Sequence, residues 1–238
     1  MAIIYSLGRR EMRMSDSKYK MIKLQLMPVF LIMLCALSTV YASFDYMQLV
    51  LQWPPTFCKI NHCKRTPLNF TIHGLWPDME KFMLNNCKGK KYSSIEIPLE
   101  QKKMDARWPD LKNTEEFSLE EQPFWQYEYN KHGTCCQTRY NQEQYFNLTM
   151  KLKDKFDLLS ALQHHGINPG STPTVKQIGT AIATVTKVYP SLKCIPINGN
   201  LKLLEIGICF NPEATNVIPC HRSWICHQDQ NMVIEIPN

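Results

Sequence analysis

The sequence has no internal repeat, no low-complexity tract and no linker-like segment. We therefore expect a single domain, because about 200 residues suffice for one domain with a sizeable core. The sequence also lacks an uninterrupted apolar run of the roughly 20 residues needed to cross a membrane. Gln25 and Pro28 interrupt its most apolar stretch. No membrane anchor is therefore expected.

That apolar stretch has the features of a secretory signal peptide. It follows a basic segment, and Val40 and Ala42 occupy the minus-three and minus-one positions of a cleavage site. We predict that residues 1–42 are a signal peptide and that the mature, secreted domain comprises residues 43–238. Met21 is an alternative start, which would give a signal peptide of ordinary length.

The predicted mature chain has little net charge. Residues 1–42 hold six of the 27 Lys and Arg residues and two of the 21 Asp and Glu residues, which leaves 21 basic and 19 acidic residues. A net charge of +2 gives no argument for a polyanionic partner. The short basic runs at 88–91 and 102–107 are most simply solvated surface.

Cysteine is abundant, but the C-x₂-C spacing typical of zinc sites is absent. The mature chain keeps nine of the ten cysteines, and in an oxidising export route this density indicates disulfides. We predict no metal ion and no cofactor, and one thiol that is free or paired with another chain. Sequons at Asn69 and Asn147 predict glycans, which require both residues to lie at the surface.

Strand-like patterns occupy both ends of the mature chain. Residues 46–53 are a short apolar run ended by prolines, and residues 70–77 alternate before a glycine and a proline break the pattern. His73 is then expected at the end of the second strand. Strand-like chemistry returns at 201–210 and 232–238.

Helical periodicity dominates the middle of the chain. Apolar residues at three- and four-residue steps predict one helix over 145–162, ended at Gly166. A second is expected from about Thr172, with Pro190 beyond its end. Helices flanked by strands predict an α+β fold with a largely antiparallel sheet.

A further helix is expected after Pro123, in the segment FWQYEYNKHGTCC. Glu128, Lys131 and His132 would then fall at i, i+3 and i+4 on one face. The helix should end at Gly133, and its dipole would favour the imidazolium form of His132. Taken alone, this face is most simply a packed surface helix with an incidental Glu/Lys pair.

A second histidine shifts the balance towards a reactive site. His73 stands beside Gly74, which lets a ligand approach the backbone closely. Two imidazoles, one on a strand and one on a helix, suit a reaction in which one proton leaves as another is delivered. The other histidines have no such context and are expected in surface or structural positions: His62, His164, His165, His221 and His227.

The segments FTIHGLWP at 70–77 and FWQYEYNKHGTC at 124–135 resemble the two active-site segments of the T2 ribonuclease family. The likeness extends to QLVLQWPPTFC, RWPDL and the spacing of the C-terminal cysteines, and within the family it is closest to the S-ribonucleases of flowering-plant styles. It implies the T2 ribonuclease fold and metal-independent cleavage of single-stranded RNA to 2',3'-cyclic phosphate ends. DNA, which lacks the 2'-OH, would not react.

The resemblance also implies roles for individual residues. His132 matches the general base that takes the proton of the ribose 2'-OH, and His73 matches the acid that protonates the leaving 5'-oxygen. Lys131 and Glu128 match residues that stabilise the transition state. Tyr127 stands where many members carry a third histidine that helps to hold the phosphate, which predicts an active enzyme with weaker phosphate binding.

Two further residues match base-binding positions of related enzymes. Gln52 falls at a hydrogen-bonding amide and Phe124 at a stacking ring, although Phe124 suits a buried core equally well. The family pattern leaves Cys136 as a free thiol. It implies the following disulfides: Cys58–Cys63, Cys87–Cys135, Cys194–Cys226 and Cys209–Cys220.

Three functional readings remain open. As an S-ribonuclease, the protein would be the style-side cytotoxin of gametophytic self-incompatibility, secreted into the extracellular matrix of the style as a monomer. Pollen-side F-box proteins would recognise a variable surface at about 80–94 and 102–116. The alternatives are an S-like ribonuclease for phosphate recovery or defence, and a catalytically inactive secreted binding glycoprotein on the same fold.

Overall fold

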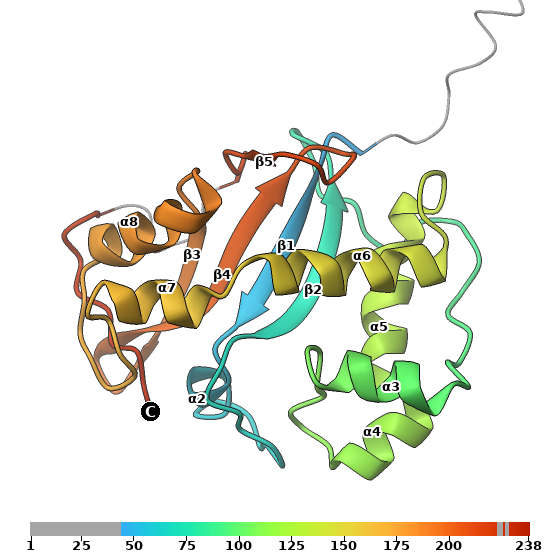
Figure 1. Cartoon of the computed structure of the whole chain (residues 1–238), viewed down its shortest axis with the longest axis horizontal. Helices are drawn as coiled ribbons and strands as arrows, with labels where there is room; N and C mark the ends of the chain where they lie inside the picture. The colour runs from blue at the N-terminus through green and yellow to red at the C-terminus, as the bar shows by residue number, and fades with distance from the viewer. Residues whose placement is uncertain (1–43, 223–225, 227–228) are drawn as a thin grey trace, which may run out of the picture. The chain divides into compact units, whose positions relative to one another are not determined.

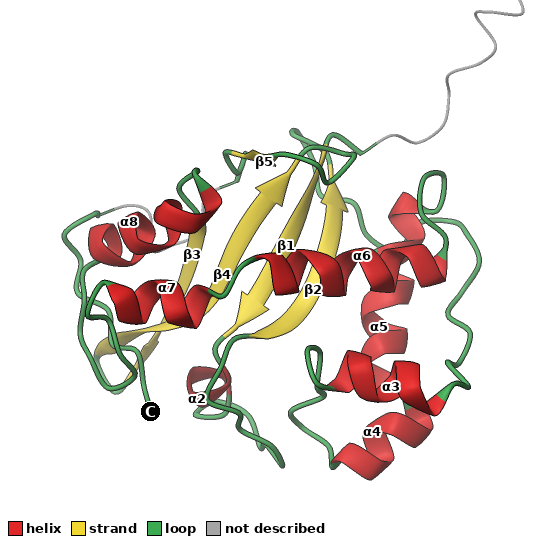
Figure 2. Cartoon of the chain, viewed as in Figure 1, coloured by secondary structure: helices red, strands yellow, loops and turns green. Residues whose placement is uncertain are grey.

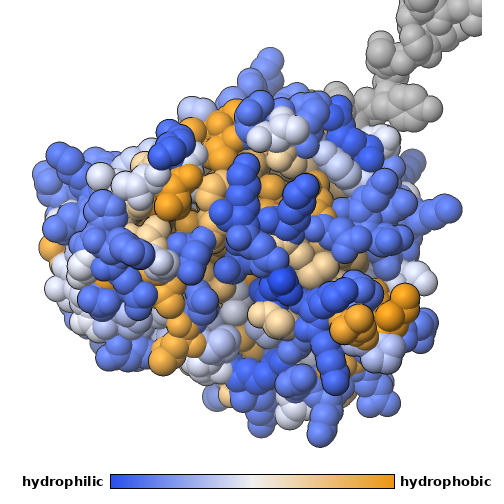
Figure 3. All heavy atoms as spheres, viewed as in Figure 1, coloured by the Kyte–Doolittle hydropathy of each residue, from blue (hydrophilic) through white to orange (hydrophobic). Residues whose placement is uncertain are grey.

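The structure is a computed structural model that describes residues 44–222, 226 and 229–238. The predicted signal peptide, residues 1–42, and His227 lie outside the described residues. Within the described part, no helix has the length and apolar character that a membrane crossing requires. The face drawn in Figure 3 is mostly hydrophilic with smaller apolar patches, as expected when the core takes up most of the apolar side chains.

An antiparallel sheet forms the centre of the domain (Figure 1). Its order is β2-β1-β4-β3, with β5 paired to β4. Every residue of β1 is buried, as its apolar run predicts for a central strand. The α+β class with an antiparallel sheet is therefore confirmed. The strands are β1 (Tyr46–Gln52), β2 (Thr71–Asp78), β3 (Ser191–Ile197), β4 (Asn200–Phe210) and β5 (Val217–Ile218).

Helices lie beside the sheet and across one of its faces, as Figure 2 shows for α6 and α7. They are α2 (Pro54–Phe57), α3 (Pro98–Asp105), α4 (Glu115–Glu121), α5 (Pro123–Lys131), α6 (Gln142–Lys155), α7 (Leu158–His164) and α8 (Val175–Thr186), with a 3₁₀ helix, η1, at Gly133–Cys136. Thr174 begins α8 with a capping box, two residues beyond the expected start.

The single helix expected over 145–162 is wrong, because the chain breaks there into α6 and α7. Phe156 is extended (φ −129°, ψ 109°), and Asp157 caps α7 through the Ser160 amide. The apolar period runs across the break because each helix buries an apolar side, α6 against β1 and β2 and α7 mainly against α8. Periodicity alone therefore did not reveal the interruption.

The expected end of β2 is also wrong. The strand runs on to Asp78, and Pro77 pairs with Met47 without breaking it. A proline is tolerated there because β2 is an edge strand. His73 consequently lies near the start of the strand instead of at its end. The C-terminal segment 232–238 is not a strand either, since it forms only isolated bridges, such as Lys202 with Glu235.

An aromatic core joins β2 to the helices that face it. Trp108 donates its indole N–H to the carbonyl of His73 at 3.0 Å, and Trp125 donates to the carbonyl of Trp108 at 2.8 Å. Tyr145 donates to the carbonyl of Leu75 at 2.8 Å. These hydrogen bonds come from core side chains and fix the backbone around His73.

The described residues form four disulfides: Cys58–Cys63, Cys87–Cys135, Cys194–Cys226 and Cys209–Cys220. They are the pairings that the resemblance implies. Cys136 is free and buried, and burial raises the pKa of its thiol to about 12. Both sequon asparagines, Asn69 and Asn147, are exposed.

Candidate active site

His73 projects from a β-bulge in β2. Val50 of β1 pairs with Gly74 and Leu51 pairs with Ile72, so His73 is the extra residue between the two pairs. Bulges re-aim side chains and are frequent beside active sites. The His73 ring accordingly reaches Glu205 of β4, with Nδ1 2.6 Å from Oε1.

Glu128 of α5 faces the other side of the same ring. Its Oε1 lies 3.7 Å from His73 Nε2, and its Oε2 accepts a hydrogen bond from Trp76 Nε1 at 3.1 Å. The carboxylate lies so close to β2 that a Cβ on Gly74 would stand 2.3 Å from Oε2. Gly74 is therefore required by the close approach of the helix side chain to the strand.

His132 lies one residue beyond α5, where the sequence places it. Its ring stacks on Trp76, with centroids 4.9 Å apart and planes 23° apart, and the side chain is buried. Within the described part of the chain, neither ring nitrogen has a hydrogen-bond partner. Both nitrogens are themselves buried, so a substrate hydroxyl can reach them only when the surrounding side chains move.

The expected imidazolium at His132 is wrong. Burial, together with the charges of Lys131 and His73, lowers the pKa of His132 to about 3. Desolvation of the charged form thus outweighs the favourable end of the helix dipole. A neutral imidazole with a free nitrogen can accept a proton, which is the form a general base needs.

The pKa of His73 moves the opposite way. Burial lowers it, but the hydrogen bond to Glu205 and the charges of Glu205 and Glu128 outweigh burial and raise it above the ordinary value. Burial raises the pKa of Glu128, against the charges of His73 and Lys131. The site therefore holds one imidazole neutral and favours the protonated form of the other.

Lys131 and Tyr127 form the outer edge of the site. Lys131 Nζ donates to the Tyr127 hydroxyl at 3.2 Å and lies 5.2 Å from the ring centroid. Tyr127 is 56% exposed, so both side chains can meet a ligand at the surface.

A hollow of about 390 Å³ opens beside His73. This volume is in the range of small-ligand sites. Phe124 is half-buried, with its ring 6.1 Å from that of His73, so it both contacts the core and faces the hollow. The other lining residues that matter for the argument are Gln52, Phe57, Tyr127, Glu128 and the segment 110–113. His132 and Lys131 are not among the lining residues.

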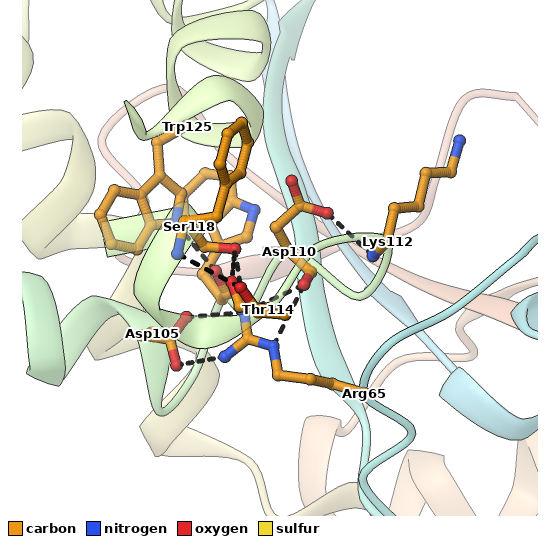
Figure 4. A network of polar contacts seen from close by, with 9 residues as sticks. Arg65, Asp105, Asp110, Lys112, Thr114, Ser118 and Trp125 are labelled. Carbon is orange, nitrogen blue, oxygen red and sulfur yellow. Dashed lines mark hydrogen bonds and ion pairs between the residues drawn. The ribbon is translucent and has the colours of Figure 1, made fainter. Parts of the chain in front are cut away.

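Arg65 fixes the wall of the hollow formed by 110–113 (Figure 4). Its guanidinium donates two hydrogen bonds to Asp105, at 2.7 and 2.9 Å, and two to the Asp110 carbonyl, at 2.9 and 3.2 Å. The Asp110 carboxylate in turn accepts from the Lys112 amide and from Asn113. This network was not expected from the sequence, because its members are scattered from 65 to 118.

Three more residues at the site were missed. Trp76 stands inside the GLWP segment, but its place between the two histidines depends on the fold. Glu205 left a visible signal, since it is the only acid in the apolar run LKLLEIGICF. Lys193 left none. Among the described residues, no group of three His, Cys, Asp or Glu side chains is arranged to hold a metal ion.

Comparison with known proteins identifies the class. The model of the Ribonuclease T2 family matches residues 44–220, so the chain belongs to this family. It is 51% identical to Ribonuclease S-2 of Nicotiana alata over 207 residues, which cover 87% of this chain and 95% of that protein. It is 48% identical to Ribonuclease S-2 of Solanum tuberosum over 219 residues, covering 90% and 98%.

Solved structures agree with these sequence relationships. The crystal structure of SF11-RNase of Nicotiana alata, associated with gametophytic self-incompatibility, matches with a TM-score of 0.77 at 46% identity, covering 82% of this chain and 100% of that one. Ribonuclease MC1 from bitter gourd seeds matches with a TM-score of 0.69 at 30% identity, covering 77% and 97%. The protein is an endoribonuclease of the S-ribonuclease type.

Proposed function

We propose that the protein cleaves single-stranded RNA with His132 as general base and His73 as general acid. The observation that supports this assignment best is the opposite electrostatics of the two imidazoles on either side of Trp76. The base must be neutral and the acid protonated at the same pH, and the surroundings of His132 and His73 favour those two states.

The reaction requires two proton transfers, one from the substrate hydroxyl and one to the leaving oxygen. His132 takes the proton of the ribose 2'-OH, and the 2'-oxygen attacks the adjacent phosphorus. As the P–O5' bond breaks, the Nε2 proton of His73 passes to the 5'-oxygen. The products carry a 2',3'-cyclic phosphate and a 5'-OH. The substrate supplies its own nucleophile, so the proposal needs no metal and no cofactor, and DNA is not a substrate.

Groups around the two histidines stabilise the charge that develops on the phosphate. Lys131 provides an ammonium at the exposed edge, next to the Tyr127 hydroxyl. Glu128 lies against His73 Nε2, where its charge favours the imidazolium form of that ring. Gln52 and Phe124 line the hollow beside His73, where they bind a base by hydrogen bonding and stacking.

In the plant, the proposed role is that of the secreted, style-side cytotoxin of gametophytic self-incompatibility. Identity near 50% to ribonucleases named S-2 supports this role over an S-like role in phosphate recovery or defence. The protein acts as a monomer that pollen-side F-box proteins recognise, and glycans occupy the exposed Asn69 and Asn147. A transcript confined to the style supports the role, and one found equally in leaf and root contradicts it.

Replacement of the base tests the chemistry. His132→Asn is expected to lower kcat for single-stranded RNA by about 10²- to 10⁴-fold, the usual contribution of a general base. His164→Asn is the matched control, because His164 is exposed on α7 and, among the described residues, its ring hydrogen-bonds to Ser160 alone. Folding of both variants is checked by their thermal unfolding. Cleavage by folded His132→Asn at the rate of the control would remove His132 from the mechanism.

A further inference from the structure

An ion pair of buried Glu205 with Lys193 lies next to the Nδ1 atom of His73. The Glu205 side chain is 3% exposed, and its two oxygens are divided between two cations. Oε1 contacts His73 Nδ1 at 2.6 Å, and Oε2 accepts from Lys193 Nζ at 2.9 Å. A buried carboxylate is costly unless its oxygens are hydrogen-bonded and its charge is paired, and here both conditions are met.

The register of the sheet and the bulge in β2 bring these residues together. Glu205 pairs with Gln52 of β1 on one side and with Lys193 of β3 on the other, which puts the three side chains on one face. β2 is two strands from β4, roughly 10 Å at ordinary strand spacing. The bulge at His73 tilts its ring across β1, and a second shift in register follows Lys193. Lys193 and Glu205 are directly opposite in the register and would meet on regular strands, whereas the contact between His73 and Glu205 depends on the bulge.

We propose that Glu205 is the positioning residue of the proposed acid, and that Lys193 holds Glu205 in place. The inference rests on the proposed function of His73. Glu205 binds the Nδ1–H of the imidazolium, which leaves the Nε2–H directed towards Glu128 and the hollow. When the Nε2 proton passes to the leaving oxygen, the remaining proton stays on Nδ1, bonded to Glu205.

The charges around His73 come from each element packed against it. Glu205 of β4 and Glu128 of α5 favour the imidazolium, whereas Lys193 of β3 opposes it. His132 lies beyond Trp76 and is neutral above about pH 3. Burial alone would raise the pKa of Glu205, but the hydrogen bond and charge of His73, followed by Lys193, lower it. Glu205 therefore remains ionised and supports the protonated form of His73.

Glu205→Gln tests the proposal, because glutamine keeps the shape and removes the charge. Activity requires protonated His73, so kcat falls as the pH rises through the pKa of His73. In Glu205→Gln this alkaline limb should move to lower pH. The kcat at neutral pH should fall about 10- to 100-fold, less than the full contribution of a general acid, while KM stays unchanged.

Glu235→Gln is the matched control. It breaks the Lys202–Glu235 pair, which also joins β4 to a neighbouring segment but does not touch His73. Its alkaline limb should coincide with that of the wild type. If Glu205→Gln lowers kcat without moving the limb, or changes neither, the positioning role is overturned.

A measurement on the wild type keeps the proposal testable if Glu205→Gln does not fold. In ¹⁵N-histidine NMR, neutral His73 should carry its proton on Nδ1, and the pKa of His73 should lie above the ordinary value for histidine. A proton on Nε2 would overturn the proposal. This readout does not depend on catalysis. Loss of the proposed function would instead appear as a folded His73→Gln variant that still cleaves RNA.

Discussion

At the scale of the residue, the two histidines differ because their contacts differ. His73 has carboxylates on both ring nitrogens, whereas His132 is stacked on Trp76 with no partner among the described residues. A carboxylate partner offsets the cost of burying a charge, whereas a stacked indole offsets far less of it. The surroundings of the two histidines therefore favour opposite protonation states.

Tyr127 is the position at which the chain departs from the T2 family pattern. Because its side chain is exposed, it can be replaced without disturbing the core. Tyr127→His adds a side chain that can become a cation next to Lys131, where the phosphate is expected. Since the position is open to solvent, the gain should be about 1 kcal/mol, a roughly fivefold lower KM for RNA below pH 6.

Tyr127→Phe is the control for that change. It removes the hydroxyl that accepts from Lys131 but adds no charge, so its KM should not fall. Initial rates over a range of RNA concentrations measure both variants. An unchanged or higher KM for Tyr127→His would show that this position does not bind phosphate.

At the scale of the element, the junction of α5 and η1 holds His132 in place. The chain turns there at Gly133 without adopting the left-handed backbone conformation that often ends a helix. A Cβ on Gly133 would stand 2.3 Å from the Tyr129 ring, which is buried in the core. The glycine is thus needed for close packing of η1 on α5 instead of for its backbone freedom.

Gly133→Ala tests this packing. The added methyl should force the Tyr129 ring to shift and lower the free energy of unfolding by about 1–3 kcal/mol, as overpacked cores do. Gly89→Ala is the control, because the nearest atoms to its Cβ are the far end of the flexible Gln137 side chain. Urea denaturation of both variants measures the cost. A Gly133→Ala variant as stable as Gly89→Ala would contradict this reading.

The elements also show what the sequence could predict. Strands β1 and β4, helix α5 and the surface positions of both sequons follow from local patterns, which depend only on nearby residues. The bulge at His73 does not, because register depends on a partner strand elsewhere in the chain. Glu205 lies 132 residues from His73, so their contact is a property of the sheet order. The burial that lowers the pKa of His132 is likewise set by tertiary packing.

Within the whole domain, a disulfide connects the proposed recognition surface at 80–94 to the catalytic site. Cys87, inside the segment 80–94, is bonded to Cys135, three residues beyond His132. The Asn86 amide also donates to the Lys131 carbonyl at 2.7 Å. Exposed Phe82 and Met83 lie on the same segment, which gives a partner apolar side chains to bind.

Cleavage by internal attack of the 2'-oxygen determines the chemical ends of the product, which can be measured. The purified protein is incubated with an RNA oligonucleotide, and with the same oligonucleotide carrying one 2'-deoxy residue, and the fragments are identified by mass spectrometry. We expect 2',3'-cyclic phosphate and 5'-OH ends, with no cleavage after the deoxy residue. Fragments with 5'-phosphate ends, or cleavage after the deoxy residue, would contradict internal attack.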